Sequence, residues 1–451
     1  MDTLKRYNEE VAKLGDSLAG SRLSMLFDNG EFTQIDRFVK NNEAGCEVVT
    51  AYGEVNGMLV YAFAQNVDVN SGAMGRVQAA KIARVYELAT KTGAPVVAVF
   101  DSKGAHVDEG VEALEAYGAL IKAAGNISGV VPQIAVVCGA CIGSAAVLAN
   151  LSDIVVMSEG AELYITAPTV TNNSSFAKVA LENGIAAVVA SDDASAMKKV
   201  AEILSYLPSN NLSEPMYADC LAPAGGDIIA SVVDNGSFVE LYAAYGECIK
   251  TGFARIAGTS VGIVATDSKV NDGYFCDCGA KKAAKFVRLC DAYSIPVVTL
   301  VDSKGIETCE DSCGSDVKSV AVLASAYSEA TTAKITLVTG NAIGGAYISF
   351  VSSAGAPDMV YAYADSTIGV LEPMTAVQFL YKERLANGED RKALEKEYAS
   401  DKCSPFNAAA LGLVNDVIEP ADAVNKIVSA LDILSSKRVS TLSKKHTNIP
   451  L

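Results

Sequence analysis

The amino-acid sequence contains one series of motifs twice, and this repetition limits the chain to folds built from two similar halves. APVVAVFDSKG at 94–104 corresponds to IPVVTLVDSKG at 295–305, and GACIGSA at 139–145 corresponds to GNAIGGA at 340–346. Both pairs are 201 residues apart, because 302 − 101 and 340 − 139 give the same offset. Chance matches between short apolar strings do not share an offset, so the chain is predicted to be an internal duplication.

The start of each half carries a further match. DNGEFTQI at 28–35 corresponds to DNGSFVEL at 234–241. The segment LAPAGGD at 221–227 has the Pro and Gly residues of a linker. We therefore expect two homologous domains, 1–228 and 229–451.

Each half alternates short strands with helices. VVAVF and VVTLV are β-branched runs that end at the DSKG motifs, and apolar residues recur at helical spacing on either side of them. This βαβα order predicts α/β domains, each with a parallel sheet covered by helices. The expected helices are 79–89 and 112–124 in the first half and 283–293 and 317–330 in the second.

The net charge and the apolar runs limit the functions that the chain can have. The net charge of -17 opposes binding to phosphate backbones, so no nucleic-acid partner is expected. The segment 1–15 lacks the apolar core of a signal peptide, so we expect a cytoplasmic protein.

The uncharged run 134–152 contains Gly and Asn, and we predict a turn and a buried helix rather than a membrane span. Cys138 and Cys141 within it have no second pair at zinc spacing, so we interpret them as buried residues and expect no metal.

The chemistry is expected where a strand runs through small residues directly into a helix, at 139–149. Glycines let the backbone approach a ligand, and the first N–H groups of a helix have no internal partner, so they can stabilise negative charge. Gly143 and Ser144 are the candidate donors, and a matching junction lies at 344–346. Close packing alone also produces such junctions, so both interpretations stay open at this point.

Motifs of several other chemistries are missing or out of context. The sequence has no G-x-G-x-x-G, no Walker A loop and no H-E-x-x-H. The G-x-S-x-G string around Ser260 leads into a strand-like run, so this serine is not predicted to be a nucleophile. His106 and His446 are too few for histidine-rich metal sites or for one triad in each half. Asp108 and Glu109 are interpreted as helix caps.

Six strings, spread in order over nearly the whole chain, carry a resemblance to a known family. DSKGAHVDEG at 101–110 is similar to the pattern D-S-G-G-A-R-x-x-E-G, and GACIGS at 139–144 is similar to G-P-C-A-G-G. The second half adds TGFARIAGTSVGIVA at 251–265, AIGGAY at 342–347, PFNAAALGLVNDVIEP at 405–420 and KKHTNIPL at 444–451. With these strings, both halves resemble the carboxyltransferase subunits of biotin-dependent acyl-CoA carboxylases and decarboxylases.

The resemblance implies two tandem crotonase-like domains, each a ββα superhelix. It also implies transfer of a carboxyl group between biotin and an acyl-CoA thioester of the acetyl, propionyl, methylmalonyl or glutaconyl class. Acyl-CoA would bind mainly to domain 1–228 and biotin to domain 229–451, in a site between opposed domains of two subunits. The thioester enolate and the enolate-like biotin oxygen would each need an oxyanion hole.

The motif match also implies individual site residues. Gly143 and Ser144 would form one oxyanion hole, and Gly345 and Ala346 would form the other. The repeat offset alone selects Gly344 with Gly345 for the second hole. The residues expected to bind substrate are Gly104, Ala105, Gly139, Gly305 and Gly344.

Partners follow from the same resemblance. The biotinylation signature A-M-K-M is absent, AMKK at 196–199 being the nearest string, so biotin is expected on a separate biotin carboxyl carrier protein. The other expected partners are a biotin carboxylase or a membrane decarboxylase subunit, and further copies of the chain in a hexamer built as a trimer of dimers.

Several positions depart from the family pattern. Lys103 and His106 replace a glycine and an arginine, and Ser144 replaces the second glycine at the helix start. DSKGIE at 302–307 stands where D-x-P-G-F is common, and Ile348 stands where acyl-CoA carboxylases often have Asp. The acyl-CoA and the direction of transfer therefore stay open. Two alternatives also remain, namely a crotonase-type hydratase or isomerase that works without biotin and an assembly subunit without activity.

Overall fold

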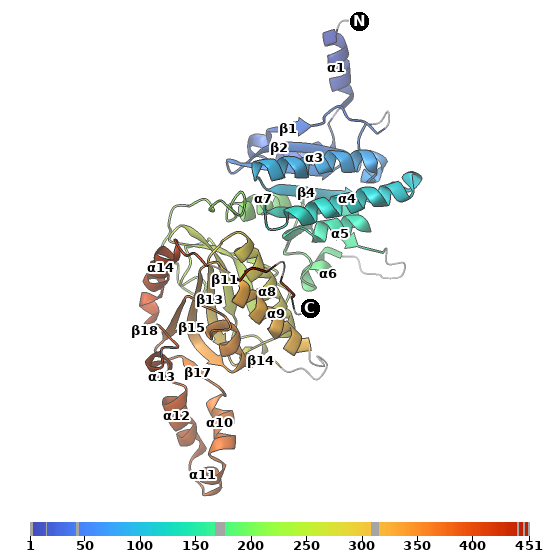
Figure 1. The fold of residues 1–451 in the computed structure, drawn as a ribbon. Helices are drawn as coiled ribbons and strands as arrows, with labels where there is room; N and C mark the ends of the chain where they lie inside the picture. The colour runs from blue at the N-terminus through green and yellow to red at the C-terminus, as the bar shows by residue number, and fades with distance from the viewer. Residues whose placement is uncertain are drawn as a thin grey trace. The chain divides into compact units, whose positions relative to one another are not determined.

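The computed structural model describes residues 3–14, 16–41, 45–166, 176–307, 315–439, 442–444 and 447–449. The chain divides into two compact units, Met1–Pro215 and Met216–Leu451 (Figure 1). Each unit contains one large sheet with its own helices, as the duplicated motifs predict.

The first unit is built on an eight-stranded sheet in the order β1-β2-β3-β4-β5-β6-β8, with β7 paired to β5. Strands β1 to β3 are antiparallel, and the pairs from β3 to β8 are parallel. Its strands are β1 (Phe32–Ile35), β2 (Val48–Val55), β3 (Met58–Gln65), β4 (Val96–Ser102), β5 (Gln133–Ile142), β6 (Ile154–Ser158), β7 (Glu162–Tyr164) and β8 (Val188–Ala190). Its helices are α1 (Thr3–Leu14), α2 (Leu18–Leu26), α3 (Arg76–Thr92), α4 (Val111–Ile127), α5 (Ser144–Asn150), α6 (Phe176–Glu182) and α7 (Asp193–Leu204).

The second unit repeats this plan in the order β18-β16-β15-β13-β11-β10-β9, with β17 paired to β15 and a separate pair β12-β14. Its strands are β9 (Val239–Leu241), β10 (Ile249–Ile256), β11 (Thr259–Thr266), β12 (Tyr274–Phe275), β13 (Val297–Ser303), β14 (Gly305–Ile306), β15 (Lys334–Ile343), β16 (Met359–Tyr363), β17 (Thr367–Gly369) and β18 (Asp416–Ile418). Its helices are α8 (Asp277–Ala292), α9 (Ser315–Glu329), α10 (Pro373–Leu380), α11 (Lys382–Ala386), α12 (Arg391–Lys402), α13 (Pro405–Ala410) and α14 (Ala423–Leu434).

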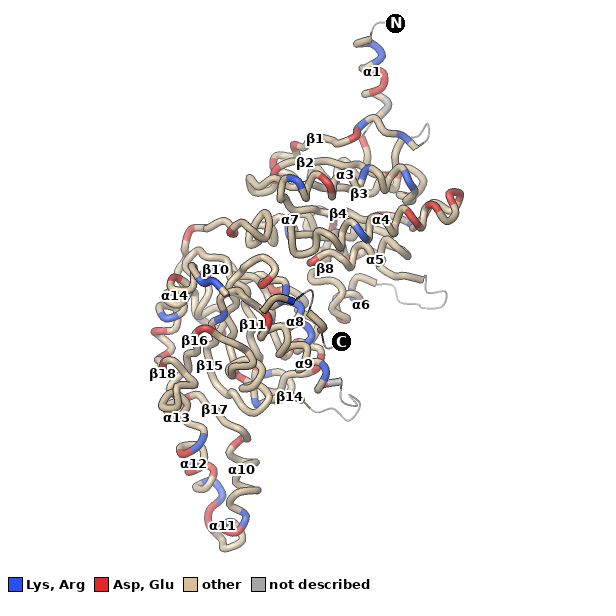
Figure 2. Tube along the Cα trace, viewed as in Figure 1, with Lys and Arg blue, Asp and Glu red and all other residues tan. Residues whose placement is uncertain are grey.

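Helices α10, α11 and α12 extend away from the second sheet, as Figure 1 shows. They have a small core of their own, made of Ala376, Val377, Leu394, Tyr398 and Cys403. Figure 2 shows residues of both charge signs interspersed along α11 and α12. Arg384 bonds Glu397 at 2.7 Å, and Arg391 bonds Glu395 at 2.8 Å.

The predicted α/β pattern is confirmed in both halves. Expected helices 79–89 and 112–124 lie inside α3 and α4, and 283–293 and 317–330 overlap α8 and α9 closely. The uncharged run 134–152 forms most of β5 and all of α5. No helix in the described part of the chain is both long enough and apolar enough to cross a membrane.

The repeated DNG motif is explained by a hairpin turn in each unit. Asp28 accepts hydrogen bonds from the N–H groups of Asn56 and Gly57, at 3.0 and 2.9 Å, in the turn between β2 and β3. Asp234 accepts from Ala257 and Gly258, at 2.9 and 2.8 Å, in the turn between β10 and β11. All four turn residues have positive φ, as two-residue turns between antiparallel strands require.

The two aspartates are predicted to differ in their contribution to stability. Asp234 is 4% exposed and holds an alanine at a φ of 49°, which a residue with a side chain rarely adopts. Asp234→Ala should lower the free energy of unfolding by about 1–3 kcal/mol, because two sheltered N–H groups lose their acceptor. Asp28→Ala should cost less, because its turn is open to water. Urea unfolding of the two variants measures the difference, and equal losses would contradict this account.

Candidate active site

A bulge at the end of a central strand prepares the site in each unit. Phe100 and Ser102 of β4 are two residues apart, but their partners on β5, Val137 and Cys141, are four apart. The extra residues at 138–140 therefore bulge out of the β4-β5 register. The second unit has the same irregularity between β13 and β15, where 301 pairs with 338 and 303 with 342.

An aspartate from the neighbouring DSKG motif holds each bulge. Asp101 Oδ1 accepts from the N–H of Ala140 at 3.3 Å, and a Cβ placed on Gly139 would lie 2.3 Å from the same oxygen. Only glycine leaves room for this carboxylate. Asp302 Oδ1 accepts both the N–H and the side-chain amide of Asn341, at 2.7 and 3.0 Å. In the sequence, these aspartates mark the repeat, and no motif there indicates their role.

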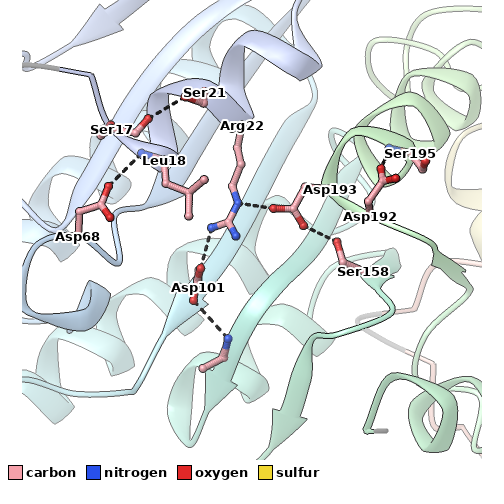
Figure 3. A network of polar contacts seen from close by, with 11 residues as sticks. Ser17, Leu18, Ser21, Arg22, Asp68, Asp101, Ser158, Asp192, Asp193 and Ser195 are labelled. Atoms are coloured by element: carbon pink, nitrogen blue, oxygen red, sulfur yellow. Dashed lines mark hydrogen bonds and ion pairs between the residues drawn. The ribbon is translucent and has the colours of Figure 1, made fainter.

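In the first unit a buried arginine fixes the aspartate in turn (Figure 3). Arg22, 4% exposed, donates from Nη1 to Asp101 at 2.7 Å and from Nε to Asp193 at 2.7 Å. Ser158 Oγ donates to the second oxygen of Asp193 at 2.6 Å. Burial alone would lower the pKa of Arg22, but the carboxylates of Asp101 and Asp193 outweigh it and raise the pKa. The network ties α2, α7 and β6 to the end of β4.

The DSKG loops lie beside the strand-to-helix junctions. Gly104 has a φ of 110°, its N–H donates to Ser102 Oγ at 3.1 Å, and a Cβ placed on it would lie 3.7 Å from the carbonyl oxygen of Ile142. Gly305 repeats this geometry, with a φ of 132° and a placed Cβ 3.6 Å from the carbonyl oxygen of Ile343. Each unit therefore brings its predicted loop glycine next to its predicted junction.

The first glycine of each junction uses its N–H inside the fold. The N–H of Gly143 donates to the carbonyl of Tyr164 at 2.9 Å, and the N–H of Gly344 donates to the carbonyl of Gly369 at 2.9 Å. Both glycines have positive φ, 66° and 50°, and turn the chain from the strand into the helix. Their structural task is therefore the turn, and the role of Gly143 as an anion donor stays a prediction.

The next two N–H groups of each junction differ from the first. Among the residues that the structure describes, Ser144, Ala145, Gly345 and Ala346 have N–H groups without a hydrogen-bond acceptor. Ala145 and Ala346 are fully buried, where an unpaired N–H is rare. Sequence reasoning missed Ala145, although the offset contained the signal, since 346 − 201 gives 145.

The two junctions differ in the size of the residues at one pair of equivalent positions. A Cβ placed on Gly345 would lie 2.5 Å from Cδ1 of Ile306, so the isoleucine covers this residue closely. The equivalent positions in the first unit are Ser144 and Ala105, since 345 − 201 and 306 − 201 give 144 and 105. A large loop residue covers a glycine in the second unit, whereas both equivalent residues of the first unit are small.

His106 of the first loop rests on a buried acid. Its Nε2 lies 3.1 Å from Oε1 of Glu47, a side chain with no exposed surface. Burial raises the pKa of Glu47, but hydrogen bonds from Asn70, His106 and Asn41 outweigh it and lower the pKa. An ionised carboxylate thus holds the side chain of His106. His446 lies outside the described residues.

Three other residues considered in the sequence are Cys138, Ser260 and Glu109, and the structure explains each of them by its place in the fold. Burial raises the pKa of the Cys138 thiol to about 12, which keeps it protonated and unreactive at neutral pH. Ser260 lies in strand β11 and is 3% exposed, without the strand-to-helix turn of a nucleophile. Glu109 accepts from the N–H of Arg76 at 2.8 Å, so it caps the start of α3.

Comparison with known proteins agrees with this geometry. The sequence model of the carboxyl transferase domain matches residues 10–449. The methylmalonyl-CoA decarboxylase subunit alpha of Propionigenium modestum is 36% identical, over 99% of this chain and 96% of its own length. The mitochondrial propionyl-CoA carboxylase beta chain of Homo sapiens is 34% identical, over 97% of this chain and 89% of its own length.

Solved structures give the same result. The crystal structure of transcarboxylase 12S, a hexamer with methylmalonyl-coenzyme A and methylmalonic acid bound, superposes with a TM-score of 0.91. It is 32% identical in sequence, and the match covers 99% of this chain and 95% of that one. The chain therefore belongs to the carboxyl transferase domain family and is a biotin-dependent carboxyltransferase with two crotonase-like domains.

Proposed function

We propose that the chain transfers a carboxyl group between methylmalonyl-CoA and biotin on a carrier protein, with propionyl-CoA as the decarboxylated partner. The observation that carries the proposal is the pair of unused N–H groups at the same junction of both units. Two such pairs suit a reaction in which two different oxygens become negative. The relatives named for methylmalonyl-CoA and propionyl-CoA match over nearly their whole lengths, which supports this acyl class.

Main-chain donors explain how the step proceeds without a catalytic triad. Removing the carboxylate from methylmalonyl-CoA leaves its bonding electrons on the α-carbon and the thioester oxygen. The N–H groups of Ser144 and Ala145 would hold that oxygen, and those of Gly345 and Ala346 would hold the ureido oxygen. When bound, biotin supplies a ureido nitrogen that exchanges the carboxyl group and the α-proton with the thioester. The same donors serve both directions, because the transition state is shared.

Charge supports acyl-CoA in the first unit and biotin in the second. Lys103 is exposed, and no carboxylate in the described part of the chain forms an ion pair with it. Its counterpart Lys304 is paired with Glu372 at 3.7 Å. A free lysine beside the first loop suits the coenzyme A phosphates. Ile306 adds apolar surface over the second pair of donors, which suits the uncharged biotin ring.

Exposed apolar residues support self-association. Several large apolar side chains of the second unit face solvent in the single chain, among them Val370 at 77%, Phe379 at 72% and Leu411 at 75% exposure. Such residues are typical of surfaces that a partner covers. We propose a hexamer built as a trimer of dimers, as the hexameric transcarboxylase 12S suggests. A biotin carboxyl carrier protein and a biotin carboxylase or membrane decarboxylase subunit complete the proposed assembly.

The activity is tested with the purified chain, methylmalonyl-CoA and free biotin. Propionyl-CoA should form at a rate that rises with biotin, because the ureido nitrogen receives the carboxyl group. The products are separated by liquid chromatography. Crotonyl-CoA is the control substrate, and its hydration without biotin would favour a hydratase. Absence of biotin-dependent turnover of methylmalonyl-CoA would defeat the proposal.

Ser144→Pro isolates one donor of the first pair. Ser144 is the first residue of α5, where proline is tolerated and where no internal hydrogen bond is lost. The variant should keep its thermal stability and lose about 100- to 1000-fold in kcat, as expected for one missing oxyanion donor. Ser144→Ala keeps the N–H and removes only the hydroxyl, so it should remain close to the unaltered protein. Equal activity of the two variants would show that this N–H has no catalytic role.

The close approach of Ile306 to Gly345 predicts that a second substitution can compensate for a larger residue at position 345. Gly345→Ser alone should displace Ile306, at a cost of about 1–3 kcal/mol in stability from overpacking, and should lower the transfer rate. Adding Ile306→Ala recreates the combination of the first unit and should restore stability and part of the rate. A double-mutant cycle of melting temperature and rate measures the coupling. Additive effects of the two substitutions would contradict direct contact.

A further inference from the structure

Two thiols meet at the start of α8, outside the site described above. Cys276 is the residue at which the helix is capped, and Cys248 directly precedes β10. Their sulfur atoms are 3.0 Å apart. A disulfide has a bond of about 2.05 Å, so the pair needs a shift of only about 1 Å to become bonded.

The backbone around the pair is shaped for these two sulfurs. A Cβ placed on Gly279 would lie 2.6 Å from Cys248 Sγ, so only glycine leaves space for that thiol. The N–H of Cys276 donates to Cys248 Sγ at 3.1 Å, and the N–H of Gly279 donates to Cys276 Sγ at 3.4 Å. Each sulfur therefore accepts a main-chain hydrogen bond, and Cys276 sits at the positive end of a 16-residue helix.

These contacts divide the pair into a nucleophile and a partner. The contact with Cys248, with the N–H groups of Gly279 and Cys278, lowers the pKa of Cys276 against the opposing effect of burial. The same contact, together with burial, raises the pKa of Cys248. The facing ionisable groups oppose one another, since buried Lys282 favours the thiolate and Glu307 disfavours it. Cys276 is half-buried, so small reagents reach it.

The fold itself does not require the two cysteines. The equivalent positions in the first unit are Glu47 and Gly75, since 248 − 201 and 276 − 201 give 47 and 75. That unit builds the same strand and helix around a carboxylate and a glycine cap. The thiol pair is therefore a property of the second unit that packing alone does not explain.

We propose that Cys248 and Cys276 form a reversible thiol–disulfide site that reacts with peroxides. The Cys276 thiolate attacks one oxygen of hydrogen peroxide, the O–O bond breaks, and a sulfenic acid and water form after proton transfer. The Cys248 thiol then attacks the oxidised sulfur and expels a second water. The two thiols lose two protons and two electrons in total, and the peroxide is reduced to two water molecules. A small dithiol restores the starting pair by exchange.

Peptide mapping of the intact protein tests the pairing without any substitution. The chain is treated with hydrogen peroxide at neutral pH, free thiols are blocked with iodoacetamide, and the digest is analysed by mass spectrometry without reductant. Peptides containing Cys248 and Cys276 should be joined, and dithiothreitol should separate them. Joining of Cys276 to another cysteine, or free Cys248 and Cys276 after treatment, would overturn the proposal.

Three measurements test the order of the steps. Cys248→Ser should leave a sulfenic acid on Cys276 that dimedone traps, whereas Cys276→Ser, which keeps a good helix cap, should yield none at either position. The control is Cys220, an exposed thiol whose pKa is raised by partial desolvation and by Asp234. Cys276 should react with iodoacetamide faster than Cys220 at neutral pH although it is less exposed, because its pKa is lowered, and its rate should fall as the pH is lowered. Faster alkylation of Cys220 would refute an activated Cys276.

Discussion

The hydrogen bond between an aspartate and a bulged strand governs the geometry of each unit. Asp101 holds the N–H of Ala140, and Asp302 holds that of Asn341. The bulge decides where the strand ends and hence where the following helix begins. Loss of either carboxylate would remove the acceptor that holds the bulge. Arg22 holds Asp101 through an ion pair, and the side-chain amide of Asn341 holds Asp302 through a hydrogen bond.

The two units carry different side chains at equivalent positions of the same frame. Ala105 and Ser144 stand in the first unit where the second has Ile306 and Gly345, so the loop residue is much larger in the second unit. No carboxylate among the described residues forms an ion pair with Lys103, whereas Lys304 is paired with Glu372. The buried position beneath the loop holds Glu47 in one unit and Cys248 in the other. The carboxylate that supports His106 and the thiol beside Cys276 therefore occupy corresponding places with different chemistry.

Much of the fold was visible in the sequence because it depends on local periodicity and on the repeat offset. The helices, the buried run at 134–152 and the two junctions are of this kind. The hydrogen bond from the N–H of Gly143 to Tyr164 was not visible in the sequence, because it depends on how β7 pairs with β5. Likewise, Arg22 meets Asp101 and Asp193 across 79 and 171 residues of sequence. No pattern in a single sequence joins charges over such separations.

The unused donors of both junctions belong to the main chain. Amide N–H groups do not ionise in the range where proteins stay folded, unlike histidine or carboxylate catalysts. Acid or alkali would thus alter the reactants and the fold before it altered these donors. Replacement of a residue by alanine keeps its main-chain N–H, so an alanine scan would not detect these donors. The proposed catalytic groups would thus lie in the backbone, where proline is the one substitution that removes an N–H.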